Sequence, residues 1–423
     1  MSKPITAVLF GAGLRGSFAY GPYAMQHPDK LEFIAVAEPD PVRRAQFATA
    51  HDIPAERQFA SWEEALAQSQ MADVVFNMTQ DQMHYASAKA ALAAGYDMLL
   101  EKPMTNTLAE TVDLVQTAEK NGRLLQICHV LRYTPFFATL HDILASGRLG
   151  KIITVEHREN VAYWHMAHSF VRGNWRNTAQ SSPMILAKCC HDLDILYWNM
   201  GQPVQRVHSF GSLMHYRPEN APEGATLRCT DGCPVDCPWD ARKHYLDPNR
   251  TTWTVMALGT DLSEAGRRKA LEEGPYGRCV YHCDNDVVDN QTVNMEFANG
   301  TTVVLFMHGH SHKEGRTMRY DGTRATLRGK FEDGTGQIEI HDHLTGECEE
   351  VPVPLATSGH GGGDYGVVRS FVQAMRGQAA ALTTARESLE SHLLAFAAEE
   401  SRLKGTVVDM ADFRRRAEEG GNR

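Results

Sequence analysis

The sequence predicts an α/β protein with a doubly wound parallel sheet in its N-terminal part. An α+β domain with an open, mostly antiparallel sheet is expected to follow. Three observations lead to this prediction. Short apolar runs alternate with helical segments as far as residue 127, and a glycine-rich turn follows the first run at once. Runs with β-type alternation dominate residues 204–343. Strand–helix alternation is typical of a parallel sheet covered by helices on both faces.

Residues 1–127 are predicted to form the first domain. The apolar runs expected as strands are 5–10, 31–38, 72–78, 96–100 and 123–129. The expected helices are 17–26, a helix that starts at Asp40-Pro41, 61–68, 81–94 and 107–121. Proline is favoured at the first position of a helix. Thr107 followed by Glu110 fits a capping box.

A glycine motif joins the first strand to its helix. Gly11, Gly13 and Gly16 have the spacing G-x-G-x-x-G. The first glycine permits a tight turn, the second lets the backbone approach a pyrophosphate, and the third lets the helix pack closely. Glu38 ends the second strand, where a carboxylate accepts ribose hydroxyls and repels the 2′-phosphate of NADP. The pattern therefore predicts a Rossmann domain that binds NAD.

Residues 128–423 are predicted to form the second domain. Its expected helices are 135–146, 365–376 and 385–403, and its expected strands are 151–156, 204–216, 289–298, 301–308, 323–330 and 337–343. Asn299-Gly300 is a strong hairpin signal. Residues 217–285 are rich in Pro, Cys and Gly and are interpreted as an insertion.

Composition and charge exclude several classes of partner. The 423 residues carry a formal net charge of −10, and no cluster of basic residues suits nucleic acid or a membrane surface. No apolar run approaches the roughly twenty residues that cross a bilayer, and the first residues lack a secretory pattern. We expect a cytoplasmic protein with neither nucleic acid nor a membrane as partner.

Several motifs together resemble the glucose–fructose oxidoreductase, inositol dehydrogenase and rhizopine-catabolism (Gfo/Idh/MocA) family. The matching residues are the motif 11–16, Glu101-Lys102-Pro103, Arg132 with Pro135, the turn 147–150, and His191 with Asp194. The resemblance implies NAD as cofactor, a cis bond before Pro103, and a homo-oligomer (dimer or tetramer) assembled through the C-terminal sheet. It also extends the cofactor site to Leu14, Arg15, Thr79, His84, Glu101 and Lys102.

Oxidation of a sugar carbinol requires a base for the hydroxyl proton and a cation near the oxygen. Lys102 is the candidate cation, and a solvated surface lysine is the structural alternative. His191 is the candidate proton relay, one helical turn from Asp194; the alternative is a core histidine. Most family members carry Asp where this chain has Ala187, so the adjacent Lys188 is an additional catalytic candidate.

A candidate substrate site follows from residues that suit an anionic sugar, namely Arg172, Trp175, Arg176, Lys188, Asp194 and His360. Arginines recognise carboxylate, phosphate or sulfonate groups through charge-assisted hydrogen bonds. The alternative is a loop whose arginines pair with local acids. His360 lies in the glycine-rich segment 358–364 and is expected to reach the site, although this segment also fits a simple linker.

Cysteines cluster at both ends of the insertion. Cys229, Cys233, Cys237 and Cys283 are a candidate set for a structural zinc ion, which four thiolates bind tetrahedrally. The spacing of three residues is looser than the usual two, so ordinary free cysteines are the alternative. Cys189 and Cys190, beside His191, are interpreted as small packing residues.

Three functions follow from these motifs. Residues 189–194 and 277–285 resemble a branch of the family that includes NAD-dependent glycosidases, among them sulfoquinovosidases. This resemblance implies redox-assisted hydrolysis of an anionic glycoside such as a sulfoquinovoside, through transient C3 oxidation, elimination, water addition and re-reduction. The alternatives are a net NAD-dependent sugar or polyol dehydrogenase and a non-catalytic sensor that binds the dinucleotide.

Overall fold

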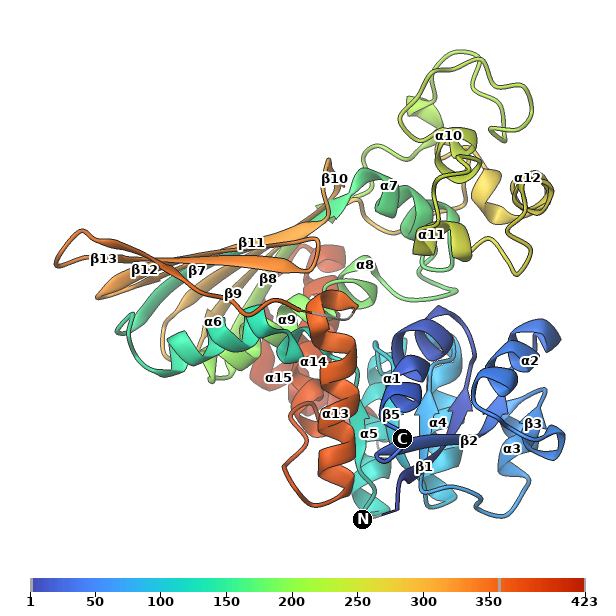
Figure 1. The fold of residues 1–423 in the computed structure, drawn as a ribbon. Helices are drawn as coiled ribbons and strands as arrows, with labels where there is room; N and C mark the ends of the chain where they lie inside the picture. The colour runs from blue at the N-terminus through green and yellow to red at the C-terminus, as the bar shows by residue number, and fades with distance from the viewer. Residues whose placement is uncertain (1–2, 357–358, 422–423) are drawn as a thin grey trace.

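The computed structural model describes residues 3–356 and 359–421. Its first sheet has six parallel strands in the order β3-β2-β1-β4-β5-β6. The bounds are β1 (Ile5–Phe10), β2 (Leu31–Ala37), β3 (Gln58–Phe59), β4 (Val74–Asn77), β5 (Asp97–Leu100) and β6 (Leu125–Ile127). This order confirms the predicted doubly wound sheet, whose topology changes direction between β1 and β4 (Figure 1).

Helices flank this sheet as its sequence predicts. They are α1 (Gly21–Gln26), α2 (Pro41–Ala50), α3 (Trp62–Leu66), α4 (His84–Ala93) and α5 (Leu108–Lys120). The side chains of Asp40 and Thr107 cap the starts of α2 and α5, as expected. The expected helix 17–26 differs, because a π-helix, η1 (Leu14–Tyr20), precedes α1. π-Helical turns are often found at functional sites.

A helix from the far end of the chain completes the first domain. The apolar face of α13 (Gly363–Met375) packs into the same core as β1 and β4 (Figure 1). The rings of Phe76 and Phe371 meet edge to face with centroids 5.7 Å apart. The chain therefore returns to the Rossmann sheet after residue 128, where the sequence predicted only the second domain.

The second sheet has nine strands in the order β14-β13-β12-β11-β7-β10-β9-β8-β15. Neighbouring strands are antiparallel except β7 and β10, which confirms the predicted mostly antiparallel sheet. The bounds are β7 (Ile152–Ala162), β8 (Val204–Ser212), β9 (Asn290–Phe297), β10 (Thr302–Ser311), β11 (Gly315–Gly322), β12 (Ala325–Glu332), β13 (Thr335–Asp342), β14 (Cys348–Val351) and β15 (Val408–Asp409).

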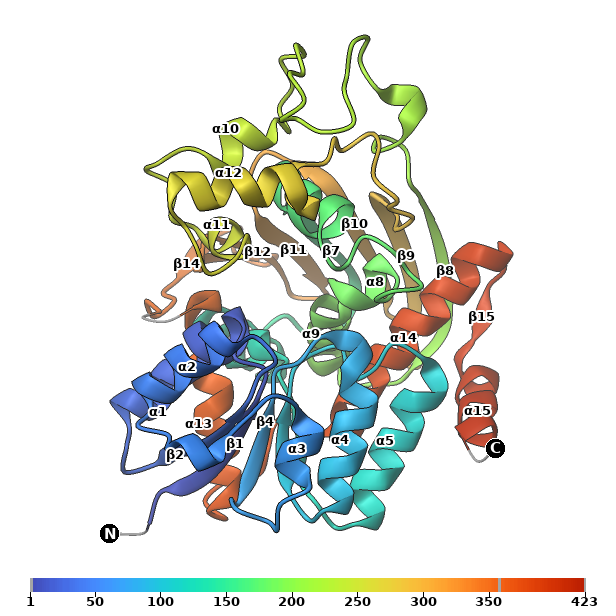
Figure 2. The ribbon, with the colours of Figure 1, turned by 90° about the vertical axis from the view of Figure 1, so that its right-hand side faces the viewer.

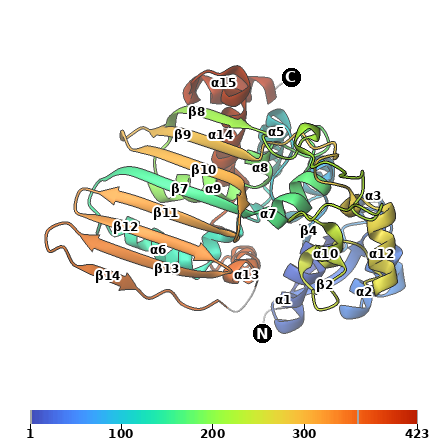
Figure 3. The ribbon, with the colours of Figure 1, turned by 90° about the horizontal axis from the view of Figure 1, so that it is seen from above.

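Helices cover one face of the second sheet. They are α6 (Pro135–Ala145), α9 (Cys190–Met200) and α14 (Ala385–Lys404), with α15 (Met410–Gly421) near the β8 edge. The opposite face is open along most of its length among the described residues (Figures 1 and 3). The short helices α7 (Tyr163–His165) and α8 (Met184–Ala187) lie at the end of the sheet nearest the first domain.

The insertion forms a separate small layer. Its helices are α10 (Ala241–Tyr245), α11 (Trp253–Met256) and α12 (Glu264–Glu273), which share a small apolar cluster. Figures 1 and 2 both place α11 above the first domain, on the side of α1 and α2. None of the helices in the described part of the chain is long and apolar enough to cross a membrane.

Candidate active site

The glycine loop has the shape that the motif predicts. Gly11 has a φ of 87°, and a Cβ there would lie 2.6 Å from the carbonyl oxygen of Met78. A Cβ on Gly16 would lie 2.3 Å from the carbonyl oxygen of Gly11. A Cβ on Gly13, in contrast, would meet no described atom within 4 Å. The loop is therefore closed against the protein and open at Gly13, which fits a pyrophosphate against the backbone.

Glu38 lies beside this loop at the end of β2. Its Oε2 accepts the backbone N–H of Ala12 at 2.7 Å, and its Oε1 accepts that of Asp40 at 3.0 Å. The nearby Arg44 donates to the Glu38 backbone carbonyl rather than to the carboxylate. The carboxylate therefore lies next to the loop, where ribose hydroxyls bind in dinucleotide complexes.

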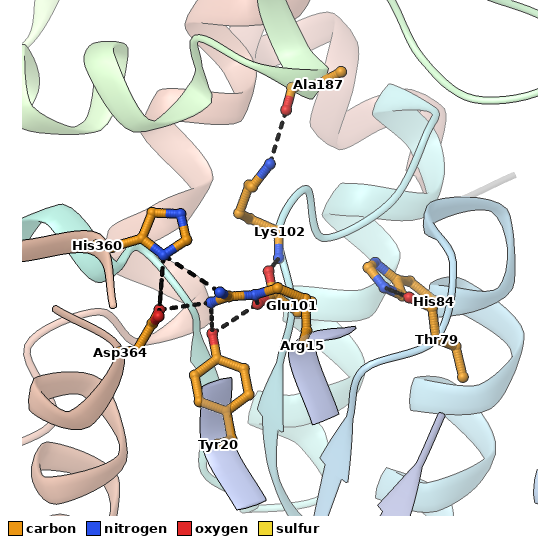
Figure 4. Close-up of polar contacts among 9 residues, drawn as sticks. All are labelled: Arg15, Tyr20, Thr79, His84, Glu101, Lys102, Ala187, His360 and Asp364. Atoms are coloured by element: carbon orange, nitrogen blue, oxygen red, sulfur yellow. Dashed lines mark hydrogen bonds and ion pairs between the residues drawn. The ribbon is translucent and has the colours of Figure 1, made fainter. Parts of the chain in front are cut away.

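Arg15, the second residue of η1, joins three parts of the protein. Its Nε donates to Glu101 Oε1 at 2.6 Å, and its Nη2 donates to Asp364 Oδ1 at 2.8 Å (Figure 4). The Tyr20 hydroxyl contacts the same guanidinium and donates to Glu101 at 2.6 Å. His360 Nδ1 lies 3.3 Å from Arg15 Nη1. Arg15 thus ties the glycine loop to β5 and to α13.

These contacts also control the charges in the network. Burial alone would raise the pKa of Glu101, but Arg15 and Lys102 bring it below its ordinary value. Asp364 behaves in the same way, because Arg15 and His360 outweigh the effect of burial and lower its pKa. Both carboxylates are therefore ionised at neutral pH, and Arg15 has two fixed partners.

Thr79 and His84 lie on the other side of β5 (Figure 4). The ring of His84 is fully buried between two carbonyl oxygens, with Nδ1 2.7 Å from Pro103 O and Nε2 3.1 Å from Thr79 O. The Thr79 hydroxyl donates to Asn77 Oδ1 at 2.8 Å. The structure therefore places His84 as the link between the two loops that follow β4 and β5.

Lys102 leaves the end of β5 and points toward the second domain (Figure 4). The peptide bond before Pro103 is cis, as the resemblance implied. The Lys102 ammonium donates to the backbone carbonyl of Ala187, on α8, at 2.9 Å. The Lys102 ammonium therefore lies at the boundary between the two domains. Since this contact uses one of its three N–H donors, the ammonium can bind a further oxygen.

His191, on the first turn of α9, lies close to this cation. Burial, Lys102 and His129 together lower the pKa of His191 well below its ordinary value. The rings of His129 and His191 meet edge to face with centroids 5.7 Å apart. Among the described residues, Nδ1 of His191 has no hydrogen-bond partner. The ring is therefore a neutral imidazole beside a cation, able to accept a proton.

His360 lies beside the Arg15 network, because its Nδ1 is 3.3 Å from Arg15 Nη1. Its side chain is half exposed, and its Nδ1 lies 3.0 Å from Asp364 Oδ1. The structure thus brings together Lys102, His191 and His360 at the carboxyl edge of the parallel sheet. Residue 358, the first of the predicted glycine-rich segment, lies outside the described residues.

Lys188 is held by acids on the sheet. Its Nζ lies 2.7 Å from Glu314 Oε1 and 3.4 Å from Glu159 Oε1. Burial would lower the pKa of Lys188, but these two carboxylates raise it above its ordinary value. His165 Nδ1 contacts the same Glu314 oxygen at 3.0 Å. Lys188 is therefore a paired ammonium ion and not a base, and its charge is largely cancelled.

A buried ionic network continues below Lys188. Arg316 reaches Glu159 Oε2 at 2.5 Å and Asp192 Oδ1 at 2.8 Å, and His157 Nε2 lies 2.8 Å from the same Asp192 oxygen. Burial raises the pKa of Glu159 to about 7 despite the attraction of Arg316 and Lys188. The network joins β7 and β11 to α9, which carries His191.

The two arginines predicted to hold an anion have other partners. Arg172 is buried and donates to the backbone carbonyls of Arg278 and Trp239, both at 2.7 Å. Arg176 forms two hydrogen bonds with Asp284, at 2.8 and 3.1 Å. Both guanidinium groups therefore hold the insertion to the domain. Their role in substrate binding stays a prediction, and these contacts give it no support.

Asp194 and Trp175 also serve the scaffold. Arg132 grips Asp194 through two hydrogen bonds, at 2.7 and 2.6 Å, and both side chains are buried. Both Asp194 oxygens are therefore engaged by Arg132, and the substrate role of Asp194 stays a prediction. The Trp175 indole N–H donates to Asp81 Oδ2 at 2.8 Å and fastens the loop after α7 to the first domain.

The four cysteines predicted as zinc ligands do not converge. In the described part of the chain, three or more possible ligand atoms come within 4.8 Å of one another only at Glu339, His341 and Cys348. Three of the four, Cys229, Cys233 and Cys237, line a small cavity together with Cys279. The thiol of Cys283 instead donates to the Cys279 carbonyl at 3.2 Å. The described residues therefore give no support to this zinc site.

Several residues near the site were not found in the sequence. His129 follows β6, so it lies at the same edge as Lys102, and this position was a usable signal. His165 and Glu314 approach the site only because α7 and the turn between β10 and β11 meet in space. Burial raises the pKa of the Cys189 and Cys190 thiols, which fits the packing role predicted for them.

Two family models match the chain over most of its length. The oxidoreductase family with an NAD-binding Rossmann fold matches residues 5–129. The C-terminal α/β domain of the same oxidoreductase family matches residues 142–410. The chain belongs to the Gfo/Idh/MocA family. It is therefore an NAD-dependent oxidoreductase, which disfavours the alternative of a sensor without chemistry.

Similar proteins span much of this Gfo/Idh/MocA chain at low identity. The putative oxidoreductase YteT of Bacillus subtilis is 23% identical over 304 residues, which cover 69% of this chain and 70% of YteT. Inositol 2-dehydrogenase of Leifsonia xyli is 30% identical over 179 residues, or 41% of this chain and 47% of that enzyme. The chain thus aligns with less than half of the dehydrogenase.

Solved structures of this family support the fold. An oxidoreductase from Agrobacterium radiobacter, solved with NAD⁺, L-tartaric acid and magnesium, aligns with a TM-score of 0.70 at 15% sequence identity. The alignment covers 97% of this chain and 99% of that one. The likeness extends to both domains and shows that the second sheet follows the Rossmann domain in the same arrangement.

Proposed function

We propose that this enzyme transfers hydride between NAD and a secondary alcohol carbon of a sugar or polyol. The observation that carries the proposal is the hydrogen bond from the Lys102 ammonium to the carbonyl of Ala187, at the end of α8 and just before the helix α9 that carries His191. A cation and a neutral imidazole are the two groups that oxidation of a carbinol requires. The sugar and polyol dehydrogenases among its relatives support the same substrate class.

Each residue has one task in this reaction. When bound, the dinucleotide supplies the hydride acceptor; Gly11, Gly13 and Gly16 would hold its pyrophosphate, and Glu38 its ribose. Lys102 binds the substrate oxygen and stabilises the negative charge that develops on it. His191 takes the hydroxyl proton, because its pKa keeps the ring neutral.

We further propose that the oxidised ring is uncharged. Arg172, Arg176 and Lys188, the cations expected to hold an anion, are engaged by carbonyls or carboxylates. An ion that already has such partners gains little from a second anion, because the partners must first be displaced. Neutral hydroxyl groups fit this surface better than the sulfonate or carboxylate that the sequence suggested.

A redox-assisted glycosidase is the second candidate function. Such a cycle needs a second base to remove the proton at C2 after oxidation at C3. His165 supports this candidate, since burial and Lys188 lower its pKa and Glu314 fixes its orientation. The positive charge of Lys102 also contributes to the low pKa of His165.

One experiment tests both candidates. The enzyme is incubated in D₂O with substoichiometric NAD and a panel of neutral sugars, polyols and methyl glycosides, and NADH and products are followed. A dehydrogenase gives NADH in proportion to NAD and an unlabelled ketose. A glycosidase gives repeated release of methanol, deuterium at C2 and no net NADH. A panel that yields neither hydride transfer nor methanol contradicts the proposal.

We also propose that the open face of the second sheet joins two copies of the chain. Phe210 on β8 is 63% exposed there. Thr292 on β9 pairs with Phe210 on one side and with Phe306 of β10 on the other. The Arg158 guanidinium lies over the Phe306 ring, 4.7 Å from its centroid. An aromatic row on an uncovered sheet face is typical of an association surface.

A further inference from the structure

Two tryptophans form an exposed aromatic surface between the insertion and the second domain. Trp253 begins α11 in the insertion, and Trp164 lies on α7. Their ring centroids are 6.1 Å apart, with an angle of 55° between the rings. Trp253 is 38% exposed, which is high for so large an apolar side chain. We call this pair the aromatic shelf.

Two histidines hold the shelf in place. The ring of His165 meets Trp253 edge to face with centroids 5.0 Å apart, and that of His168 does so at 4.9 Å. His168 is itself fixed by the Tyr245 hydroxyl, 2.7 Å from its Nδ1. Trp253 is thus positioned by two packed rings while part of it stays in contact with solvent, as in a preformed binding surface.

A chain of contacts connects the shelf to the candidate active site. Lys102 donates to the carbonyl of Ala187, and the next residue, Lys188, lies 2.7 Å from Glu314. Glu314 contacts His165 at 3.0 Å, and His165 packs on Trp253. Through these contacts, the shelf is linked to the part of the second domain that the Lys102 ammonium contacts.

We propose that the aromatic shelf binds a second sugar ring, glycosidically linked to the ring that is oxidised at Lys102. This inference rests on the proposed function and specifies its substrate as a glycoside larger than a monosaccharide. The apolar C–H face of a pyranose fits an indole face. Its hydroxyls would find His165 and Glu314 next to Trp253. Through Trp253, the insertion supplies this outer subsite.

The test measures binding rather than turnover. Dissociation constants are determined with NAD present for three pairs, namely methyl β-D-glucopyranoside and cellobiose, methyl α-D-glucopyranoside and maltose, and methyl β-D-galactopyranoside and lactose. In at least one pair the disaccharide is expected to bind the wild type about tenfold more tightly. Trp253→Ala should abolish this difference and leave the methyl glycoside unchanged, whereas Trp253→Phe should keep most of it.

Controls separate this inference from a loss of structure. Leu344→Ala removes an exposed apolar side chain from the turn after β13 and should leave both constants unchanged. If Trp253→Ala lowers Tm, Trp253→Leu, which keeps more of the volume, is measured in its place. The inference is overturned if no disaccharide binds more tightly than its methyl glycoside, or if both ligands weaken equally. Disaccharide binding without hydride transfer would contradict the proposed function but still support sugar binding at the aromatic shelf.

Discussion

A single carboxylate, Glu38, governs the choice between NAD and NADP. Glu38→Gln should raise the affinity for NADPH by about tenfold, because the charge that repels the 2′-phosphate is lost. The amide oxygen of Gln still accepts the Ala12 N–H, so the loop should keep its shape. Fluorescence titrations with NADH and NADPH measure the effect, and Glu32→Gln, on the exposed side of β2, is the matched control. A wild type that prefers NADPH would refute this assignment.

The low pKa of His191 makes a prediction about pH. Because burial and Lys102 bring this pKa well below 6.5, the ring stays neutral, and activity should persist, as pH falls through 6.5. The acidic limb of kcat/KM should therefore lie below 6.5. His191→Asn should lower kcat by about 10²–10⁴-fold and leave NADH binding unchanged. An acidic limb at or above 6.5 would show that His191 is not the base.

At this scale, the sequence identified residues that follow parallel strands better than residues on loops. Gly11, Glu38 and Lys102 each follow a strand, and the carboxyl ends of parallel strands meet at one edge. The partners of Arg172 and Arg176 lie between 67 and 108 positions away along the chain. Residue type alone does not distinguish an arginine that binds substrate from one that satisfies backbone carbonyls.

Among the elements, α9 depends on one buried ion pair. Asp194→Asn should destabilise the protein by about 3–5 kcal/mol, because Arg132 would be left buried without its counter-ion. Urea denaturation measures this loss, and Asp142→Asn, on the exposed side of α6, should leave the stability unchanged. At a temperature where the variant is folded, KM for the sugar should stay at its wild-type value. If Asp194→Asn raised KM and left stability unchanged, Asp194 would be a substrate-binding residue.

The errors in predicting β7 and β11 share a physical cause. β7 was expected to end at residue 156, yet it continues to Ala162 because His157 and Glu159 are buried and paired. Arg316 on β11, the partner of Glu159, lies in a strand that the sequence did not indicate. Alternation of apolar and polar residues identifies strands with one solvated face. It fails where ion pairs replace apolar side chains in the interior.

At the scale of the whole molecule, the open sheet face predicts association. Phe210→Glu should weaken the oligomer, since a charge would be buried in an aromatic contact. Light scattering coupled to size-exclusion chromatography should then give a smaller mass than for the wild type. Leu344→Glu, in the exposed turn after β13, is the control. A wild type that elutes at the 47.0 kDa of one chain would contradict the proposed association.

The two domains meet functionally at Lys102, and its substitution tests the central claim most directly. Hydride transfer to saturating NAD is measured in a single turnover for wild type, Lys102→Met and the exposed control Lys120→Met. The account predicts a loss of about 10²–10³-fold for Lys102→Met alone, with the dissociation constant for NADH unchanged. Transfer at the wild-type rate by Lys102→Met would contradict it.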